Sequence, residues 1–472
     1  MTGIRPLAVA ATTAALLAAA ACSKPEPPTA PAAPPPAAAA AEPTPSAGTS
    51  TPGAQGLLVK PVAGATHGTY SVWDATGEKR LKEHAPADEV VPFPPGRYRL
   101  VDQTSYLPYA KEAEVKPGAT TTILLGALRL LPVEGAANAV YSIYDGTGEK
   151  RFREHNEPGA AVSAGPGKYR LSDQTSYMPF AKDVEVKAGE VAEVRIGAMR
   201  LVPVEGAANA VYSIYDATGE KRFREHNEPG AAVSAGPGKY RLFDQASYAP
   251  FAKDVDVKAG ETTEVRIGAM RLVPVEGAAH AVYSLYDATG EKRLREHNEP
   301  DRVLSAGPGK YRLFDQASYA PYAKDVEVRA GETTEVAIGA LKVVAVEGAD
   351  HGVYSTYDAT GEKRLREHGE PGRVVSAGPG KYTLFDQSSY TPYARDVEVK
   401  AGATTVVALG AIRGPGAAWS LYDATGQKRF RENVEAGAVI SAGPGKYRVR
   451  DQGSGKEVGG AEVVAGAIAE VK

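Results

Sequence analysis

Residues 244–254 read Asp-Gln-Ala-Ser-Tyr-Ala-Pro-Phe-Ala-Lys-Asp, which places an acid, an amide, a hydroxyl, two aromatic rings and a lysine close together. Such groups can act as nucleophile, general acid or general base, or can bond and stack against a ligand. The stretch recurs at 102–112, 173–183, 315–325 and 386–396, each time with Ser-Tyr-x-Pro-aromatic. It is the first candidate for catalysis, for binding, or for shaping the chain.

Catalysis finds no further support in the sequence. There is no Gly-x-Ser-x-Gly elbow, no phosphate-binding loop and no His-Glu-x-x-His motif. The Gly-Pro-Gly strings stand between expected strands, where a turn is needed in any case. The sequence therefore predicts no enzyme, no cofactor and no small-molecule substrate.

Two other polar patterns could bind metal ions. Residues 225–228 (Glu-His-Asn-Glu) place a histidine beside carboxylates, and residues 216–220 could begin a calcium loop. A metal site needs several converging ligands, whereas neighbours on a strand point to opposite faces. A solvated edge and an Asp-initiated turn are the preferred interpretations, so no metal is predicted. The first pattern recurs at His84, His155, His297 and His368.

Charged residues Lys221, Arg222, Arg224 and Glu225 recur from copy to copy and could form a ligand patch. Mixed charges on a short strand more often keep a sheet edge from pairing with other chains. Nearly identical tandem copies are especially prone to such mispairing. We therefore favour a protective role for these residues.

The overall charge excludes one class of partner. The formal net charge is −3, so no strongly basic field is available to neutralise a phosphate backbone. Nucleic acid is not an expected partner. Gly and Pro are plentiful while Phe and Trp are scarce, which predicts many turns and several small cores.

The only cysteine, Cys22, follows an apolar run at 7–21 that Arg5 precedes. This pattern is typical of an export signal. Residues 16–22 (Leu-Leu-Ala-Ala-Ala-Ala-Cys) resemble a bacterial lipoprotein lipobox, which implies acylation of Cys22 after cleavage. With Ser23 next, the resemblance implies the outer membrane if the cell is Gram-negative. An ordinary signal cleavage site and an incidental cysteine are the alternatives.

The rest of the chain divides into a tether and six copies of one unit. Residues 24–55 are mostly Pro, Ala, Ser and Thr and bury too little apolar surface to repay their ordering entropy. Tyr-Ser then recurs at intervals of 71 residues, and Trp419-Ser420 opens a shortened last copy. The predicted parts are a signal peptide at 1–21, a lipidated cysteine with a disordered tether at 22–55, and repeats at 56–126, 127–197, 198–268, 269–339, 340–410 and 411–472, the last being a cap.

The sequence pattern of each copy predicts an all-β fold. In the copy at 198–268, residues 211–216 and 239–244 alternate with the period of half-buried strands. Residues 254–258 and 263–267 alternate more cleanly around a short turn and predict a hairpin. Residues 221–226 predict a strand or one helical turn. The expected core consists of Tyr212, Ile214, Tyr240 and Leu242.

The spacing of these strands predicts a small antiparallel β-sandwich, of Ig-like or transthyretin-like type, in each copy. The whole chain is therefore expected to be a tandem array of six such repeats of about 71 residues. A sandwich of this size without disulfides has a small stability margin, so contacts with neighbouring copies would help it.

A family resemblance supports this assignment. Pro-Val-Glu-Gly-Ala at 203–207, Pro-Gly-Lys-Tyr at 237–240, the stretch 247–257 and Thr-Thr-Glu-Val at 262–265 resemble the PEGA-type domain. More broadly, the pattern is similar to carboxypeptidase-regulatory, transthyretin-like sandwiches. The resemblance implies a non-catalytic, extracytoplasmic spacer or interaction module.

The sixth copy separates the opening motif into two parts. Residues 451–458 keep Asp-Gln but lose both aromatic residues and the proline. Terminal repeats are expected to drop residues that pack against the next unit, so the aromatic residues could form the joint between copies. They could instead be exposed rings that stack on sugars such as cell-wall glycan, or a loop that plugs its own sandwich. The candidates are Tyr106, Tyr109, Tyr177, Phe180, Tyr248, Phe251, Tyr319, Tyr322, Tyr390 and Tyr393.

These observations predict a non-catalytic, exported protein that is held to a membrane by a lipid anchor. Its repeats would act as an envelope spacer or interaction scaffold in a bacterial cell envelope. The alternative is a multivalent binding protein for envelope polysaccharide or for another envelope protein, in which repeated weak sites give avidity.

Overall fold

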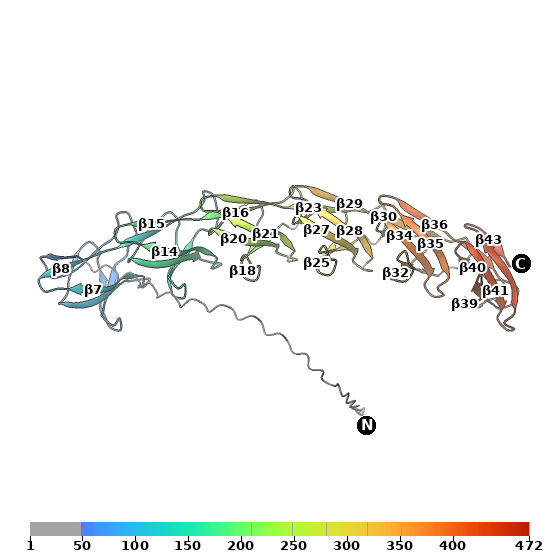
Figure 1. Cartoon of the computed structure of the whole chain (residues 1–472), viewed down its shortest axis with the longest axis horizontal. Helices are drawn as coiled ribbons and strands as arrows, with labels where there is room; N and C mark the ends of the chain where they lie inside the picture. The colour runs from blue at the N-terminus through green and yellow to red at the C-terminus, as the bar shows by residue number, and fades with distance from the viewer. Residues whose placement is uncertain are drawn as a thin grey trace, which may run out of the picture. The chain divides into compact units, whose positions relative to one another are not determined.

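The computed structural model of the 472-residue chain describes residues 49–471 except 209, 248, 280, 319 and 351 (Figure 1). Cys22 and the predicted export signal lie outside the described residues. Every regular element of the described part is a β-strand. Within this part, no helical segment has the length and hydrophobicity that a bilayer requires. The predicted all-β class is confirmed.

Repeat 3 has seven strands in two sheets. Its strands are β16 (Gly197–Val202), β17 (Tyr212–Tyr215), β18 (Arg222–Asn227), β19 (Ala232–Ala235), β20 (Gly238–Asp244), β21 (Pro250–Val257) and β22 (Thr262–Arg266). One sheet has the order β19-β16-β22 and the other has the order β18-β17-β20-β21. The pairing of β16 with β22 is parallel, and the other pairings are antiparallel. The predicted tandem β-sandwiches are confirmed, with this one parallel pairing in the smaller sheet.

The other repeats follow the same strand order. Repeats 1 and 2 contain β1 (Thr49–Pro52), β2 (Gly56–Lys60), β3 (Tyr70–Asp74), β4 (Arg80–Ala85), β5 (Val90–Pro92), β6 (Gly96–Asp102), β7 (Pro108–Val115), β8 (Ala119–Leu124), β9 (Gly126–Leu131), β10 (Tyr141–Asp145), β11 (Arg151–Asn156), β12 (Ala161–Ala164), β13 (Gly167–Asp173), β14 (Pro179–Val186) and β15 (Val191–Arg195).

Repeats 4 to 6 contain β23 (Gly268–Val273), β24 (Tyr283–Tyr286), β25 (Arg293–Asn298), β26 (Leu304–Ala306), β27 (Gly309–Asp315), β28 (Pro321–Val328), β29 (Thr333–Ala337), β30 (Gly339–Val344), β31 (Tyr354–Tyr357), β32 (Arg364–Gly369), β33 (Val374–Ala377), β34 (Gly380–Asp386), β35 (Pro392–Val399), β36 (Thr404–Ala408), β37 (Gly410–Arg413), β38 (Trp419–Asp423), β39 (Arg429–Val434), β40 (Val439–Ala442), β41 (Gly445–Asp451), β42 (Glu457–Val463) and β43 (Ile468–Glu470).

The core of repeat 3 lies between its two sheets. Tyr212, Ile214 and Leu242 are fully buried, and Tyr240 is nearly so. Alternation along β17 and β20 brings these side chains to one face, where Met199 and Leu201 from β16 meet them. The predicted core is confirmed. Burial of each large side chain contributes about 1.5–3 kcal/mol.

The predicted hairpin at 254–258 and 263–267 is wrong. β21 pairs with β20 in the larger sheet, whereas β22 pairs with β16 in the smaller one. The turn between them therefore carries the chain from one sheet to the other. Val257 and Val265 both point into the same core, from opposite sides. Alternation shows only that each strand buries one face. Two strands in facing sheets bury one face each, as two strands of a hairpin do, so alternation cannot distinguish these arrangements.

Residues 221–226 form most of an edge strand and not a helical turn. β18 pairs only with β17 at the border of the larger sheet, and the register shifts twice along this pairing. His226 adopts a left-handed conformation, with φ of 55°. The irregular ladder explains why the sequence pattern of this segment was ambiguous.

Strand β1 lies within the segment for which the sequence predicts a tether. Thr49–Pro52 pairs antiparallel with β8 and makes the smaller sheet of repeat 1 four-stranded, in the order β1-β8-β2-β5. Thr49 and Thr51 are β-branched and favour extended backbone once a strand edge is available to them. Composition alone could not reveal that edge.

Candidate functional site

The part of the opening motif that the sixth repeat keeps is a turn that closes a hairpin. In repeat 1, β6 ends at Asp102, whose Oδ1 accepts hydrogen bonds from the amides of Thr104 (3.1 Å) and Ser105 (2.8 Å). The Tyr106 amide donates to the Asp102 carbonyl oxygen at 3.0 Å. Burial opposes ionisation of Asp102, but the bonds from Ser105 and Thr104 outweigh it and hold its pKa below the usual value. This carboxylate shapes the chain.

The first aromatic residue of the motif is half exposed and has an uncommon backbone. Tyr106, Tyr177 and Tyr390 are 49%, 55% and 50% exposed. Each has a φ between 54° and 56°, in the left-handed region. For a residue with a bulky side chain this conformation costs about 1–2 kcal/mol. Repeat 6 has Gly455 at this position, with φ of 66°. Tyr248 and Tyr319 lie outside the described residues.

The second aromatic residue lies in the core of its own repeat. All five members are 1% exposed, namely Tyr109, Phe180, Phe251, Tyr322 and Tyr393. The tyrosine hydroxyls donate to the turn aspartates, at 3.0 Å for Tyr109 to Asp102 and 2.8 Å for Tyr393 to Asp386. The second aromatic residue therefore fills its own sandwich, and where it is a tyrosine its hydroxyl also holds the turn.

The residue before the proline packs against the next repeat. Leu107 of repeat 1 is fully buried in the cluster formed by repeats 2 and 3. Ala249 of repeat 3 belongs to the core of repeat 4, and Ala320 of repeat 4 packs against the core of repeat 5. The loop of one repeat therefore covers an open end of the following sandwich.

The backbone of the Pro-aromatic pair meets a glycine of the next repeat. The Gly165 amide donates to the Pro108 carbonyl oxygen at 2.9 Å, and the Gly443 amide donates to that of Pro392 at 3.0 Å. A Cβ on Gly236 would lie 2.3 Å from the Pro179 carbonyl oxygen, so only glycine fits. The equivalent residue of repeat 1 is Pro94, and no repeat precedes it in this sequence.

A second backbone contact comes from the Pro-Val-Glu-Gly-Ala loop. Ala137 of repeat 2 forms a parallel bridge with Val233 of repeat 3. The Ala137 amide donates to Ala232 and the Ser234 amide donates back to Ala137, both at 2.9 Å. The same bridge occurs at every junction, as Thr66 with Val162, Ala208 with Leu304, Ala279 with Val375 and Asp350 with Ile440.

A buried ion pair crosses three of the junctions. Arg224 of β18 contacts Asp173 of the preceding repeat, and both side chains are largely buried. Equivalent pairs join Arg295 to Asp244 and Arg366 to Asp315, the last at 2.6 Å. Burial opposes ionisation of Asp315, but Arg366 and Ser318 outweigh it and lower its pKa. At the last junction, Arg431 pairs with Asp350 at 2.9 Å.

The protective role predicted for the charged strand did not include the ion pair between Arg224 and Asp173. Arg222 pairs with Glu225 on the strand surface at 2.9 Å, as a solvated edge requires. Arg224 instead turns inward to a partner 51 residues earlier. The sequence analysis grouped Arg224 with the other charged residues of the strand, because no local signal marks so distant an aspartate.

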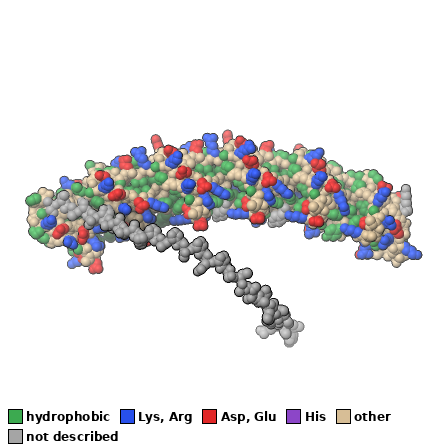
Figure 2. Space-filling model, in the orientation of Figure 1, with side chains coloured by type: hydrophobic (Ala, Val, Ile, Leu, Met, Phe, Trp, Pro, Cys, Tyr) green, Lys and Arg blue, Asp and Glu red, His purple; other side chains and the backbone are tan. Residues whose placement is uncertain are grey.

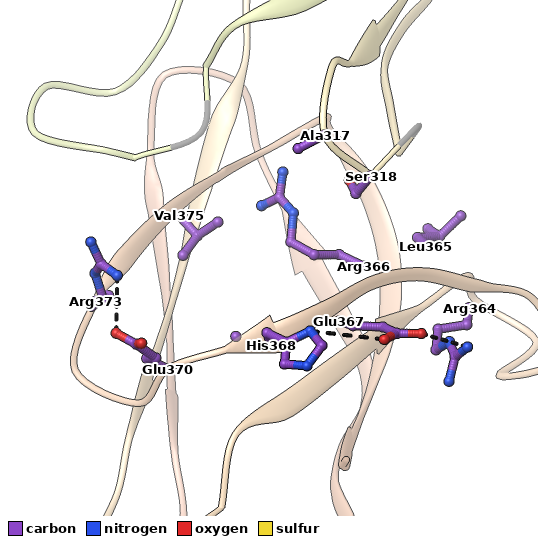
Figure 3. Close-up of a pocket in the computed structure, with 11 residues that line it drawn as sticks. Ala317, Ser318, Arg364, Leu365, Arg366, Glu367, His368, Glu370, Arg373 and Val375 are labelled. Atoms are coloured by element: carbon purple, nitrogen blue, oxygen red, sulfur yellow. Dashed lines mark hydrogen bonds and ion pairs between the residues drawn. The ribbon is translucent and has the colours of Figure 1, made fainter. Parts of the chain in front are cut away.

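A polar groove accompanies the junction between repeats 4 and 5 (Figure 3). Its volume is about 520 Å³, and Ala317 and Ser318 of repeat 4 form one side of it. Glu367 pairs with Arg364 at 2.5 Å, while Arg373 pairs with Glu370 at 3.0 Å (Figure 3). Arg366 points away from these pairs toward Ala317 and Ser318.

A similar groove of about 430 Å³ lies between repeats 3 and 4, beside Ser247 and β25. Both grooves offer paired charges and hydrogen-bonding groups to a ligand. Figure 2 shows both signs of charge interspersed over the visible face, with apolar atoms between them. The grooves therefore suit a polar ligand better than a strongly charged one.

The remaining predicted patterns have local partners. Asp216 Oδ1 accepts hydrogen bonds from the Gly219 amide and the Thr218 hydroxyl, both at 2.8 Å, which confirms the Asp-initiated turn. Among the described residues, no three His, Cys, Asp or Glu side chains form a group that could hold a metal. Cys22, the predicted lipidation residue, lies outside them.

No family model and no curated protein matches the chain, so the PEGA-like resemblance stays a prediction. Solved structures that match include the Bacillus anthracis TIE protein, at 16% identity over 59% of this chain and 67% of that one, with a TM-score of 0.13. BcpA, the major pilin subunit of Bacillus cereus, matches at 11% identity over 44% and 91%, with a TM-score of 0.12.

The pilus adhesin SpaC from Lactobacillus rhamnosus GG, in its open conformation, matches at 8% identity over 65% of this chain and 42% of its own, with a TM-score of 0.15. Likeness at these scores transfers no function to this chain.

Proposed function

We propose that the chain is an exported, lipid-anchored, non-catalytic envelope protein whose β-sandwich repeats act as a spacer and interaction scaffold. The pattern that ends in Cys22 supports export and acylation, and so supports a position in the bacterial envelope, at the outer membrane if the cell is Gram-negative. Replacing Cys22 by Ser should then release the protein from the membrane fraction.

The recurring joint between repeats carries the scaffold proposal. Each junction has a parallel backbone bridge, and the glycine of each following repeat sits against the Pro-aromatic carbonyl groups. Directional backbone bonds and a clash-limited glycine contact restrict rotation between neighbours more than a flexible linker would. A scaffold needs that restriction, because it must hold its repeats at set positions.

Spin labels on adjacent repeats test this role. The exposed residues Lys187 and Lys258 are equivalent in repeats 2 and 3 and can carry labels after Lys→Cys exchange in full chain that has Cys22→Ser. A scaffold predicts one narrow distance distribution, which broadens when Gly236→Ala disturbs the joint. A broad distribution in the parent chain would remove the scaffold proposal.

A second function, multivalent binding of envelope polysaccharide, is favoured by the tyrosines. These rings are half exposed, and their backbone conformation is strained. Because glycine would fit at lower cost, a tyrosine at this position is expected where its ring contacts a ligand. The paired charges of the neighbouring grooves could bond to sugar hydroxyls.

Pulldown with purified cell-wall glycan separates the two functions. Tyr106→Gly, Tyr177→Gly and Tyr390→Gly together keep the left-handed backbone and remove three of the five rings. Saturable binding that is lost in this variant supports the second function. No retention of the parent chain leaves the spacer role alone, and equal saturable retention of parent and variant removes these tyrosines as the contact.

A further inference from the structure

The smaller sheet of most repeats has an open edge. Strands β15, β22, β29, β36 and β43 each end a three-stranded sheet and pair on one side only, within the described residues. Such a strand presents unpaired N–H and C=O groups to which another extended segment can bond.

Repeat 1 shows that this edge can take a further strand. β1 covers β8, with Thr49 opposite Thr122 and Thr51 opposite Thr120. Two contacts extend the pairing, from the Gly53 amide to the Gly118 carbonyl oxygen at 3.3 Å and from the Gly118 amide to Gln55 Oε1 at 3.1 Å. The strand that binds is extended, uncharged and rich in hydroxyl groups.

Most of the open edges carry charges that discourage such pairing. The middle of each edge in repeats 2 to 4 is a glutamate, paired with an arginine on the adjacent strand. The pairs are Glu193 with Arg129 at 3.3 Å, Glu264 with Arg200 at 3.9 Å, and Glu335 with Arg271 at 3.4 Å. Repeat 6 has Glu470, which pairs with Arg413 at 3.4 Å.

The edge of repeat 5 lacks this protection and resembles the covered edge of repeat 1. Residues 402–407 read Gly-Ala-Thr-Thr-Val-Val, and residues 118–123 read Gly-Ala-Thr-Thr-Thr-Ile. No charged residue stands between Lys400 and Arg413. Val406 is 58% exposed at the position where the other edges have glutamate. An uncharged edge with an exposed valine is the kind that binds an added strand.

We propose that β36 is an acceptor site for an extended, uncharged, Ser/Thr-rich segment of a partner protein. The segment adds antiparallel, as β1 does on β8. By the spacing of the repeats, Val406 and Thr404 take the places of Thr122 and Thr120. The site rests on the proposed scaffold function and gives that scaffold a partner class.

A peptide with the sequence of residues 45–55 (Pro-Ser-Ala-Gly-Thr-Ser-Thr-Pro-Gly-Ala-Gln) is a suitable probe, because it contains the strand that binds β8. Labelled peptide should bind the full chain saturably at one site. Val406→Glu with Ala408→Arg copies the edge of repeat 3 and should abolish binding. Val464→Glu changes a valine that is similarly exposed (61%) but lies outside β36, and should leave binding intact.

The reverse exchange, Glu264→Val with Arg266→Ala, should create a second site and raise the stoichiometry from one to two. No binding by the parent chain, or binding that survives Val406→Glu with Ala408→Arg, overturns the proposal. Self-association that this variant abolishes assigns the edge to a second copy and also overturns it. Failure here leaves the spin-label distances unchanged, so it is distinguishable from failure of the scaffold role.

Discussion

The same loop occurs in repeats 5 and 6 with different surroundings. Both loops close a hairpin through an aspartate, which accepts a hydrogen bond from the Ser389 amide in repeat 5 (2.8 Å) and the Ser454 amide in repeat 6 (2.6 Å). Thr391 is then buried and the next residue's carbonyl oxygen accepts the Gly443 amide. The equivalent Lys456 is exposed.

The motif therefore has two parts with separate structural roles. The Asp-Gln-x-Ser part makes the turn and survives in both repeats. The x-Pro-aromatic part is present where another repeat follows and absent in repeat 6. We therefore expect substitutions of the residue before the proline to act on the neighbouring repeat, whereas the aromatic ring that follows lies in the core of its own repeat.

The largest effect is expected from Leu107→Lys. Leu107 is fully buried in the core of the following repeats, so a lysine loses apolar contacts and brings a charge. The expected cost is about 3–5 kcal/mol. Calorimetric unfolding of the full chain measures it. Lys456→Leu, at the same position in repeat 6, is the control and should change little; equal effects would remove the distinction between the two loops.

Arg366→Met should follow, at about 3 kcal/mol, because it leaves Asp315 buried without its ionic partner. Arg364→Met is the matched control two residues away, where the arginine is about half exposed and a surface pair is worth less than about 1 kcal/mol. Denaturant unfolding distinguishes them. Similar losses for both variants would show that the pair across the joint has no special weight.

A smaller effect concerns pH. The pKa of Asp315 is held below its usual value, so the folded chain releases this proton more readily than the unfolded chain. Its contribution to stability is present above a pH of about 4 and disappears as pH falls through the lowered pKa. Melting temperature should therefore fall on acidification less steeply in Asp315→Asn than in the parent. Parallel curves would contradict this.

The smallest effect is expected from Tyr177→Gly. Glycine adopts positive φ without steric cost, so removing a half-exposed ring should stabilise the repeat or leave it unchanged, within about 1 kcal/mol. Thermal unfolding provides the measurement. A loss of several degrees would place the ring in the joint itself.

Sequence periodicity predicted the sandwich and its core, because Tyr212 and Leu242 follow the two-residue alternation of half-buried strands. It could not distinguish a hairpin from two strands in facing sheets, since β21 and β22 bury the same kind of face. It also missed Arg224, whose partner Asp173 is distant in the chain. The sequence did contain one signal of the joint between repeats. Pro94 stands in repeat 1 at the position where the later repeats have the glycine that contacts the preceding repeat.

The Ser234 amide offers the most direct test of the joint, because its hydrogen bond goes to Ala137 of the preceding repeat. In full chain, hydrogen exchange at Ser234 should be slow, and Gly236→Ala should accelerate it while Gly416→Ala, at a glycine with open space around it, does not. Fast exchange at Ser234 in the parent chain, or exchange that Gly236→Ala leaves unchanged, would contradict a built joint between the repeats.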